Sequence, residues 1–163
     1  MPTSYVSGQH GFNYFGMGFS TNAGGPAETL FLANQDAVLG SLNTTSFNLT
    51  SIATLTPAVT LAELTGTGDG RLFAFYSPAA NAGDSFVGEV DKTTAAIIAT
   101  NHVNLPLGRG WAFGFWGGDF YLFTAPSGSS IVTRYRPSDQ SLTPVGAYPG
   151  VIVGAGVSTC APQ

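Results

Sequence analysis

Charged side chains are scarce in this sequence. Five Lys and Arg residues and nine Asp and Glu residues make up 9% of the 163 residues, against about 25% in a typical soluble domain. Lys92 is the single lysine, and the formal net charge is −4. A basic surface that would attract a phosphate backbone is therefore missing, and we expect no nucleic-acid partner.

Long apolar runs and cysteine are also lacking. No stretch of the chain approaches the roughly 18 consecutive apolar residues of a membrane-spanning helix, so we expect no membrane span. The single cysteine, Cys160, excludes a cysteine-rich zinc site and a disulfide within one chain. A lone cysteine often has no role, whereas an odd cysteine in an exported protein suggests a bond to a missing segment or to a partner chain.

We expect no signal peptide at the N-terminus of this sequence. Residues 1–5 lack both the basic segment and the apolar segment that such a peptide needs. This fits either a cytoplasmic protein or a mature or truncated exported chain. The lysine-poor composition, rich in Ser, Thr and Asn, favours the exported chain and a location outside the cell or in the cell envelope.

Residues that favour β-sheets are abundant instead. Val, Ile, Thr and aromatic residues are plentiful, whereas the surface residues of helices, Lys and Glu, are few. Clusters of Gly, Pro, Asn, Asp and Ser recur about every 8–12 residues, as turns between short strands do. The composition predicts an all-β fold of many short strands.

Parts of the chain repeat at a fixed offset. GRLFAFYSP at residues 70–78 matches GDFYLFTAP at 118–126, 48 residues later. Residues 38–43 match 86–91 at the same offset, and 131–136 form a third copy. Four short antiparallel strands in roughly every 40–50 residues are typical of a β-propeller blade. A β-sandwich with similar strands is the alternative, but an offset shared by several strands favours blades.

The first strand of each unit contains small residues, as strands crowded around a central axis require. These small-residue segments lie at 16–18, 66–68, 114–116 and 154–156, and an insertion at 21–28 follows the first of them. We therefore expect a single repeat domain over residues 1–163. Its parts are three four-stranded blades at 11–57, 58–106 and 107–149 and an extra C-terminal strand at 150–158.

Three blades do not close a ring, because propellers usually have about 4–8 blades. The end blades would each expose an apolar face and an unpaired strand. We expect either a partial propeller, whose missing blades belong to a longer chain, or a half-propeller that closes as a homo-oligomer. The low charge of the chain fits both alternatives.

Four stretches of the chain are distinctive: FGMGF at 15–19, AELTGTGDGRL at 62–72, WAFGFWGGDF at 111–120 and VGAGVSTCAP at 153–162. They resemble an uncharacterised family of secreted and lipoprotein β-propeller-like proteins of myxobacteria, over nearly the whole chain. The resemblance implies a propeller fold, an envelope or extracellular location, and further blades upstream, so that this chain is the C-terminal part of a larger propeller. It also implies that a disulfide partner for Cys160 lies upstream. It assigns no activity and no catalytic residue.

Two acidic residues are candidates for a site at the mouth of the channel. Asp69 and Asp119 occupy equivalent hairpins, and a ring of carboxylates there would bind Ca²⁺ or a polar ligand. The alternative is that both are turn residues, a common role of Asp. Further acids that would gather with them are Glu63, Glu89 and Asp91.

Aromatic residues near the same turns are candidates for sugar stacking. Trp116, beside the Gly117-Gly118 turn, and Tyr121 offer flat apolar faces, although packing between blades would use them equally well. Cofactor, metal and catalytic motifs are not found, because the two histidines are isolated and no nucleophile motif is present.

These observations favour a non-enzymatic module that binds a protein or a glycan, or that builds an assembly. The alternatives are a carbohydrate-active hydrolase or lyase, or a lectin-like protein, with its site at the channel mouth.

Overall fold

Three four-stranded antiparallel sheets form the computed structural model, which describes residues 3–22, 26–80 and 83–163. The first sheet contains β1 (Phe15–Thr21), β2 (Glu28–Asn34), β3 (Val38–Leu42) and β4 (Leu49–Thr54). The second contains β5 (Val59–Gly66), β6 (Leu72–Pro78), β7 (Phe86–Val90) and β8 (Ile97–His102). The third contains β9 (Trp111–Trp116), β10 (Asp119–Thr124), β11 (Ser130–Arg136) and β12 (Ser141–Tyr148). The prediction of an all-β chain with three four-stranded units is confirmed.

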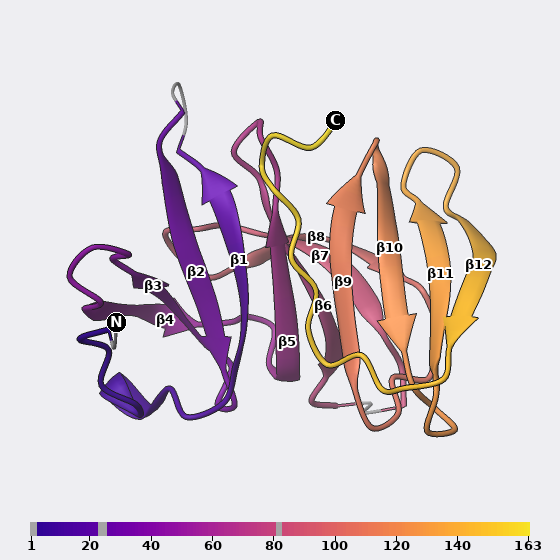
Figure 1. The fold of residues 1–163 in the computed structure, drawn as a ribbon, viewed down its shortest axis with the longest axis horizontal. Helices are drawn as coiled ribbons and strands as arrows, with labels where there is room; N and C mark the ends of the chain where they lie inside the picture. The colour runs from indigo at the N-terminus through magenta and orange to yellow at the C-terminus, as the bar shows by residue number, and fades with distance from the viewer. Residues whose placement is uncertain (1–2, 23–25, 81–82) are drawn as a thin grey trace.

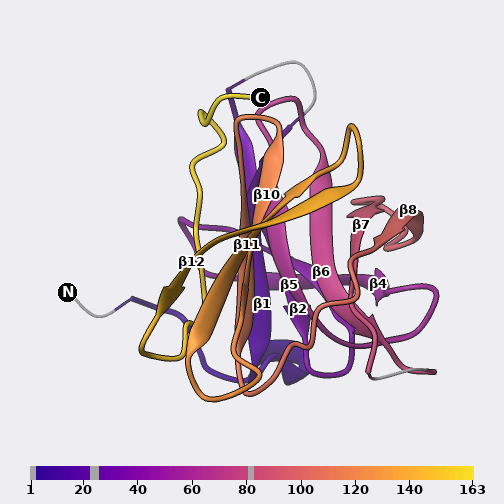
Figure 2. The same ribbon diagram turned by 90° about the vertical axis from the view of Figure 1, so that its right-hand side faces the viewer.

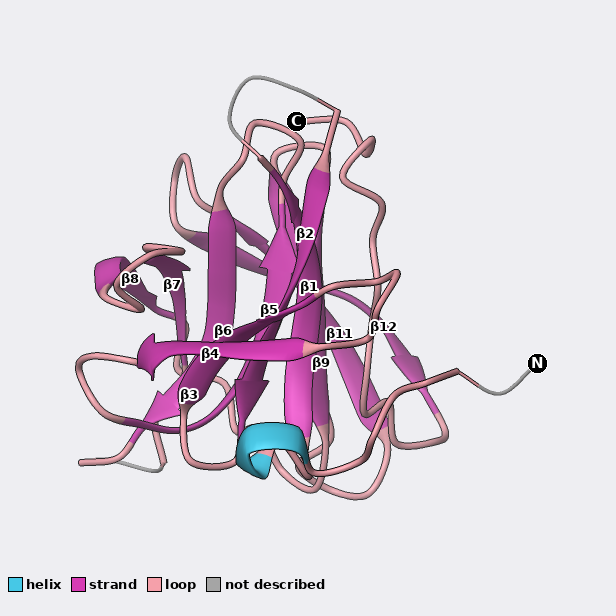
Figure 3. Ribbon diagram, turned by 90° about the vertical axis from the view of Figure 1, so that its left-hand side faces the viewer, coloured by secondary structure: helices cyan, strands magenta, loops and turns pink. Residues whose placement is uncertain are grey.

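The sheets fan out from their first strands, β1, β5 and β9, as the blades of a partial propeller do (Figure 1). In that view the first sheet extends to the left, the second points away from the viewer and the third extends to the right. β7 and β8 lie at the right-hand side of Figure 2 and at the left-hand side of Figure 3, which in both views is the side away from the viewer of Figure 1. The side of the inner strands that faces the viewer in Figure 1 is therefore not covered by any described sheet.

Helices contribute little to the described part of the chain. A single 3₁₀ turn, Gln9–Gly11, precedes β1, and no helix in the described ranges is long and apolar enough to cross a membrane. Residues 23–25 of the predicted insertion at 21–28 lie outside the described residues.

The predicted extra strand is present as an extended segment without regular strand pairing in the described structure. Residues 151–157, here called the C-terminal segment, run upward between β5 and β9 in Figure 1. A Cβ added at Gly110 of the approach to β9 would lie 2.7 Å from Val151, and one added at Gly114 would meet Val157. The segment therefore packs on β9 where the inner strand of a fourth blade would lie.

The pairing of strands shows which positions of the three sheets are equivalent. Leu72 and Phe120, which the 48-residue repeat matches, pair with Gly66 and Phe115 respectively. Gly114 is thus equivalent to Thr65, one position away from the alignment that the small-residue segments suggested. The reason is turn length, since five residues join β5 to β6 and only two join β9 to β10.

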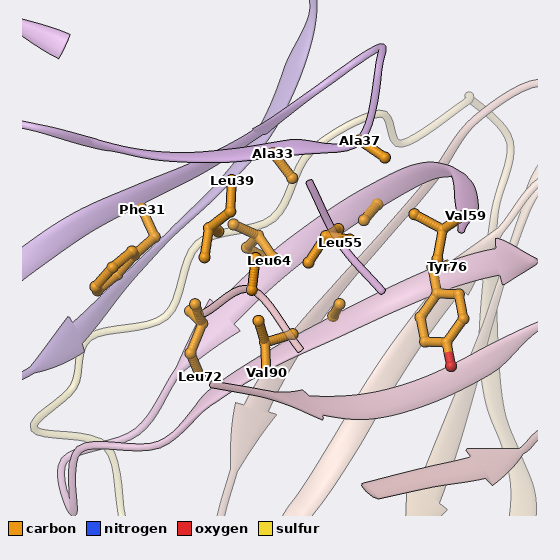
Figure 4. Packing of buried hydrophobic residues seen from close by; sticks show 13 residues of the cluster. Phe31, Ala33, Ala37, Leu39, Leu55, Val59, Leu64, Leu72, Tyr76 and Val90 are labelled. Atoms are coloured by element: carbon orange, nitrogen blue, oxygen red, sulfur yellow. The ribbon is translucent and has the colours of Figure 1, made fainter. Parts of the chain in front are cut away.

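Apolar side chains fill the space between neighbouring sheets. Between the first and second sheets, Leu39, Leu64 and Leu72 are at most 1% exposed (Figure 4). Between the second and third sheets the core is aromatic, and the rings of Phe73 and Phe120 meet edge to face with centroids 4.9 Å apart. Each of these strands is apolar because its side chains pack against a neighbouring sheet.

The faces that point away from the second sheet are called outer faces here. On β1 the outer face carries Phe15, Met17 and Phe19, whereas Gly16 and Gly18 face the second sheet. Part of this face is covered, because Phe12 is fully buried against Leu32 and Leu49 of the first sheet. On the third sheet, strand alternation places Trp116, Asp119, Tyr121 and Phe123 on the outer face.

The single lysine joins the first two sheets. Lys92, from the β7–β8 turn, donates hydrogen bonds to Ser20 Oγ at 3.2 Å and to the Thr21 carbonyl at 2.9 Å. Its ammonium also lies 5.9 Å from the centroid of the Phe31 ring. A long cationic side chain at this position therefore links the end of β1 to the second sheet.

Glycine is required where β1 meets β5. A Cβ added at Gly18 would lie 2.7 Å from the Leu64 carbonyl oxygen and 2.8 Å from Thr65 Cα, both backbone atoms that cannot rotate away. We expect Gly18→Ala to lower the free energy of unfolding by about 2 kcal/mol, because the strands must separate. Chemical denaturation measures this change. The control is Gly146→Ala on β12, where a Cβ meets no atom within 4 Å; an equal loss there would contradict the explanation.

Candidate functional site

A groove lies along the uncovered side of the inner strands and is called the axial groove here. One part, of about 520 Å³, is bounded by the beginnings of β1 and β9 and by β5. The adjoining part, of about 480 Å³, is bounded by β1, β5 and the C-terminal segment. Phe15, Glu63 and Val153 line both parts, so the two form one groove.

The lining of the axial groove is mostly apolar, and much of it is exposed. Met17 is 53% exposed and Val153 is 69% exposed, and Phe19 and Leu61 are each 38% exposed. Exposed apolar side chains gathered in one concave surface are typical of ligand or partner sites.

Glu63 is the single acidic residue among those that line the axial groove. It is half-buried, and no hydrogen bond or ion pair joins its carboxyl to another residue in the described ranges. Burial raises the pKa of Glu63 to about 7, because a carboxylate loses its hydration there. Two other titratable side chains line the groove, Tyr14, which is 78% exposed, and Arg109, which is also exposed.

The repeat makes the position of Glu63 unusual. Strand pairing places Glu63 opposite Phe75, and the equivalent inner-strand positions hold Gly16 and Ala112. Two of the three sheets thus have a minimal side chain where the second sheet has a carboxyl. Sequence reasoning named Glu63 only among several acids, and aligning the inner strands by their hairpins would have distinguished it.

Three predicted site residues lie together on the outer face of the third sheet. Trp116 pairs directly with Asp119 across the β9–β10 hairpin, and Tyr121 is two residues further along the same face. Trp116 is 53% exposed, while Tyr121 is half-buried. None of the three lines the axial groove.

Asp119 is held in ion pairs. Arg136 donates from Nε to Oδ1 and from Nη2 to Oδ2, each at 3.0 Å, and Arg134 Nε lies 3.6 Å from Oδ2. These hydrogen bonds from Arg136 hold the pKa of Asp119 below its usual range. The second sheet has the equivalent of the Asp119–Arg134 contact with the charges exchanged, since Arg71 Nη2 donates to Glu89 Oε2 at 2.7 Å. Cross-strand pairing of the two middle strands thus explains this carboxylate without a ligand.

Asp69 lies elsewhere, in the turn between β5 and β6. Thr67 Oγ1 donates a hydrogen bond to its carboxylate, as is common where Asp is a turn residue. Asp69 lines a separate groove of about 350 Å³ between the second and third sheets, on the opposite side of the third sheet from Asp119. Across the described ranges, no three His, Cys, Asp or Glu side chains are grouped so that they could hold a metal ion.

Cys160 is an exposed free thiol near the C-terminus. Its backbone N–H donates to Ser158 Oγ at 3.1 Å, and the neighbouring Pro162 carbonyl accepts a hydrogen bond from Gly117 N–H at 2.8 Å. The C-terminal tail is therefore fixed beside the β9–β10 turn, with the thiol at the surface.

Comparison with known proteins assigns no family. No protein-family model matches the chain, and no curated protein matches it. The resemblance to myxobacterial propeller-like proteins therefore stays a prediction.

The pH dependence of stability tests the environment of Glu63. Folding raises the pKa of Glu63 from 4.5 to about 7, so the folded state favours the protonated carboxyl. The contribution of this group to the free energy of unfolding is therefore complete below pH 4.5 and is lost as the pH rises through 7. We expect the free energy of unfolding of Glu63→Gln, relative to wild type, to rise by about 2 kcal/mol between pH 4.5 and pH 8. Denaturation across this range measures the difference. A flat difference would show that the carboxyl is solvated; Glu28→Gln, at an exposed position, is the control.

Substitution of Asp119 tests its structural role. We expect Asp119→Asn to lower the free energy of unfolding at pH 7 by about 1–2 kcal/mol, since charge-assisted hydrogen bonds to Arg136 are weakened. Because the pKa of Asp119 is lowered by folding, this difference should shrink as acid protonates the wild-type carboxylate. Exposed Asp36→Asn is the comparison variant. An Asp119→Asn protein as stable as wild type at pH 7 would leave the carboxylate free for another role.

Proposed function

We propose that the protein is a non-enzymatic, propeller-type scaffold module that closes a ring with a second copy of itself. In this assembly, the outer face of the first sheet of one copy packs on the outer face of the third sheet of the other. The C-terminal segment, which packs on β9 at that face, is displaced by β1 of the other copy. Two copies with three sheets each supply six blades, within the usual range of about 4–8. The same contact is made twice around a two-fold axis, which closes the ring.

The observation that carries this proposal is the exposure of equivalent residues on the inner strands. Met17 of β1 occupies the same position as Leu64 of β5 and Phe113 of β9. Met17 is 53% exposed, whereas Leu64 and Phe113 are each 1% exposed because a preceding sheet covers them. Met17 therefore occupies a position that a neighbouring sheet covers in the other two sheets, but no described sheet covers it.

The third sheet supplies the complementary surface. Tyr121 and Phe123 are the repeat equivalents of Phe73 and Phe75, which are 6% and 0% exposed between the second and third sheets. On the outer face of the third sheet, Tyr121 and Phe123 are only half-buried. Covering both outer faces would remove apolar surface from water, which is the main driving force for association.

The low charge of the chain supports the same proposal. A self-contained domain of this size would have more Lys and Glu on its surface than the single lysine and three glutamates present. Composition also supports the proposed location outside the cell or in the cell envelope.

Glycan binding is the second candidate, and the outer face of the third sheet favours it. Trp116 is half-exposed beside Tyr121, and aromatic rings of this kind stack on sugars. The two candidates use the same face, but the variant Trp116→Ala separates them by which property is lost. Loss of binding on a glycan array without a change in assembly would favour the glycan, whereas loss of assembly would favour the ring.

The mass in solution tests the proposed ring. We expect a particle of twice 16.8 kDa in light scattering under reducing conditions, which exclude a disulfide through Cys160. Met17→Asp should convert it to a monomer, because a carboxylate would be buried between the two copies. The control is Ile98→Asp on β8, which is 62% exposed and lies on the second sheet.

A wild-type monomer would overturn the proposal. So would a dimer that Met17→Asp leaves intact, since the contact would then involve another surface.

A further inference from the structure

We propose that the axial groove binds an organic cation with an apolar body, such as a primary alkylammonium, with Glu63 as the counter-ion. The groove is lined by residues of one chain, although Met17 and Phe19 also belong to the outer face of β1 that a second copy would cover in the proposed ring. Support for the proposed site comes from the repeat, from the missing partner of Glu63 and from the chemistry of the groove lining.

Comparison of the three repeated sheets indicates that the fold does not require Glu63. The equivalent positions in the other two inner strands hold Gly16 and Ala112, so the packing of the sheets does not need a carboxyl here. A partly buried charge costs free energy of hydration. Glu89 and Asp119, the other acids of the second and third sheets that lie in strands, recover that cost by pairing with arginines.

No such compensation is found for Glu63 within the described part of the chain. No hydrogen bond or ion pair reaches its carboxyl, although Arg109 lines the same groove. An unpaired carboxyl in a concave apolar surface is an indicator of a binding site, because a bound cation would supply the missing partner.

The residues that line the axial groove favour a cation with an alkyl chain over a metal ion. Met17, Phe19, Leu61 and Val153 would contact an alkyl chain, and each is exposed to the groove at present. Phe15 and Trp111 also line it, and aromatic residues attract ammonium groups. A metal ion fits less well, because a hard cation takes several oxygen ligands and Glu63 is the single carboxylate in the groove.

Charges on the facing elements set the pH dependence of binding. Glu63 comes from β5, Arg109 precedes β9, Tyr14 precedes β1, and the lining part of the C-terminal segment carries no ionisable side chain. Because burial raises the pKa of Glu63 to about 7, its carboxyl changes charge between pH 5.5 and 8.5. Binding of the cation should therefore strengthen as the pH rises over this range.

Calorimetry with three probes of one chain length tests the inference. We expect wild-type protein at pH 8.5 to bind n-hexylammonium at least tenfold more tightly than n-hexanol, and n-hexanoate most weakly. At pH 5.5 the preference for the cation over the alcohol should largely disappear. Equal affinity for hexylammonium and hexanol at pH 8.5, or no binding of hexylammonium, would overturn the proposal.

Three variants test whether hexylammonium binds beside Glu63. Glu63→Gln should lose the preference for hexylammonium while keeping the affinity for hexanol, which also shows that the groove is intact. Arg109→Gln should strengthen hexylammonium binding, because a like charge is removed, and Glu28→Gln outside the groove should change nothing. Carboxyl-carbon NMR gives an independent readout, since bound hexylammonium should lower the pKa of Glu63. An unchanged preference in Glu63→Gln would contradict the assignment.

Discussion

Direct contact between the backbones of β1 and β5 is the constraint on which the arrangement of the sheets depends. Gly16 and Gly18 face β5 without side chains, and Gly66 faces β1 in the same way, so that added Cβ atoms would strike the opposing backbone. This approach brings Phe31 and Leu39 of the first sheet onto Leu64 and Leu72 of the second. A close inner contact therefore lets the outer parts of the sheets form a dense core.

The third sheet meets the second differently. Phe115 stands where β5 has Gly66, and its ring stacks with that of Phe73 with centroids 6.4 Å apart. Large aromatic residues here hold β9 further from β5, and the axial groove opens beside these strands. The chain thus combines one tight and one wide junction, and Glu63 lies on the side of β5 that faces the wide one.

Much of this fold was predictable from the sequence. The 48-residue offset and the turn residues predicted three four-stranded units, because both faces of each sheet must be apolar between neighbours. The exact alignment of the inner strands was not predictable, since it depends on whether two or five residues form the hairpin turn. For the same reason the sequence did not distinguish Glu63 from the other acids. Its difference from Gly16 and Ala112 is seen only when β1, β5 and β9 are aligned by their pairing. Asp119 looked like a candidate ligand because its pairing with Arg136 depends on register, which composition does not reveal.

Cross-linking between two differently marked chains tests the proposed ring most directly. Phe73 and Phe113 belong to one core cluster, and their equivalents on the outer faces are Tyr121 and Met17. A Cys160→Ser background carrying Met17→Cys should therefore react through a short bismaleimide with a second chain carrying Tyr121→Cys. The account predicts cross-linked dimers in the mixture and none with either variant alone. Dimers from Met17→Cys alone, or none in the mixture, would contradict it.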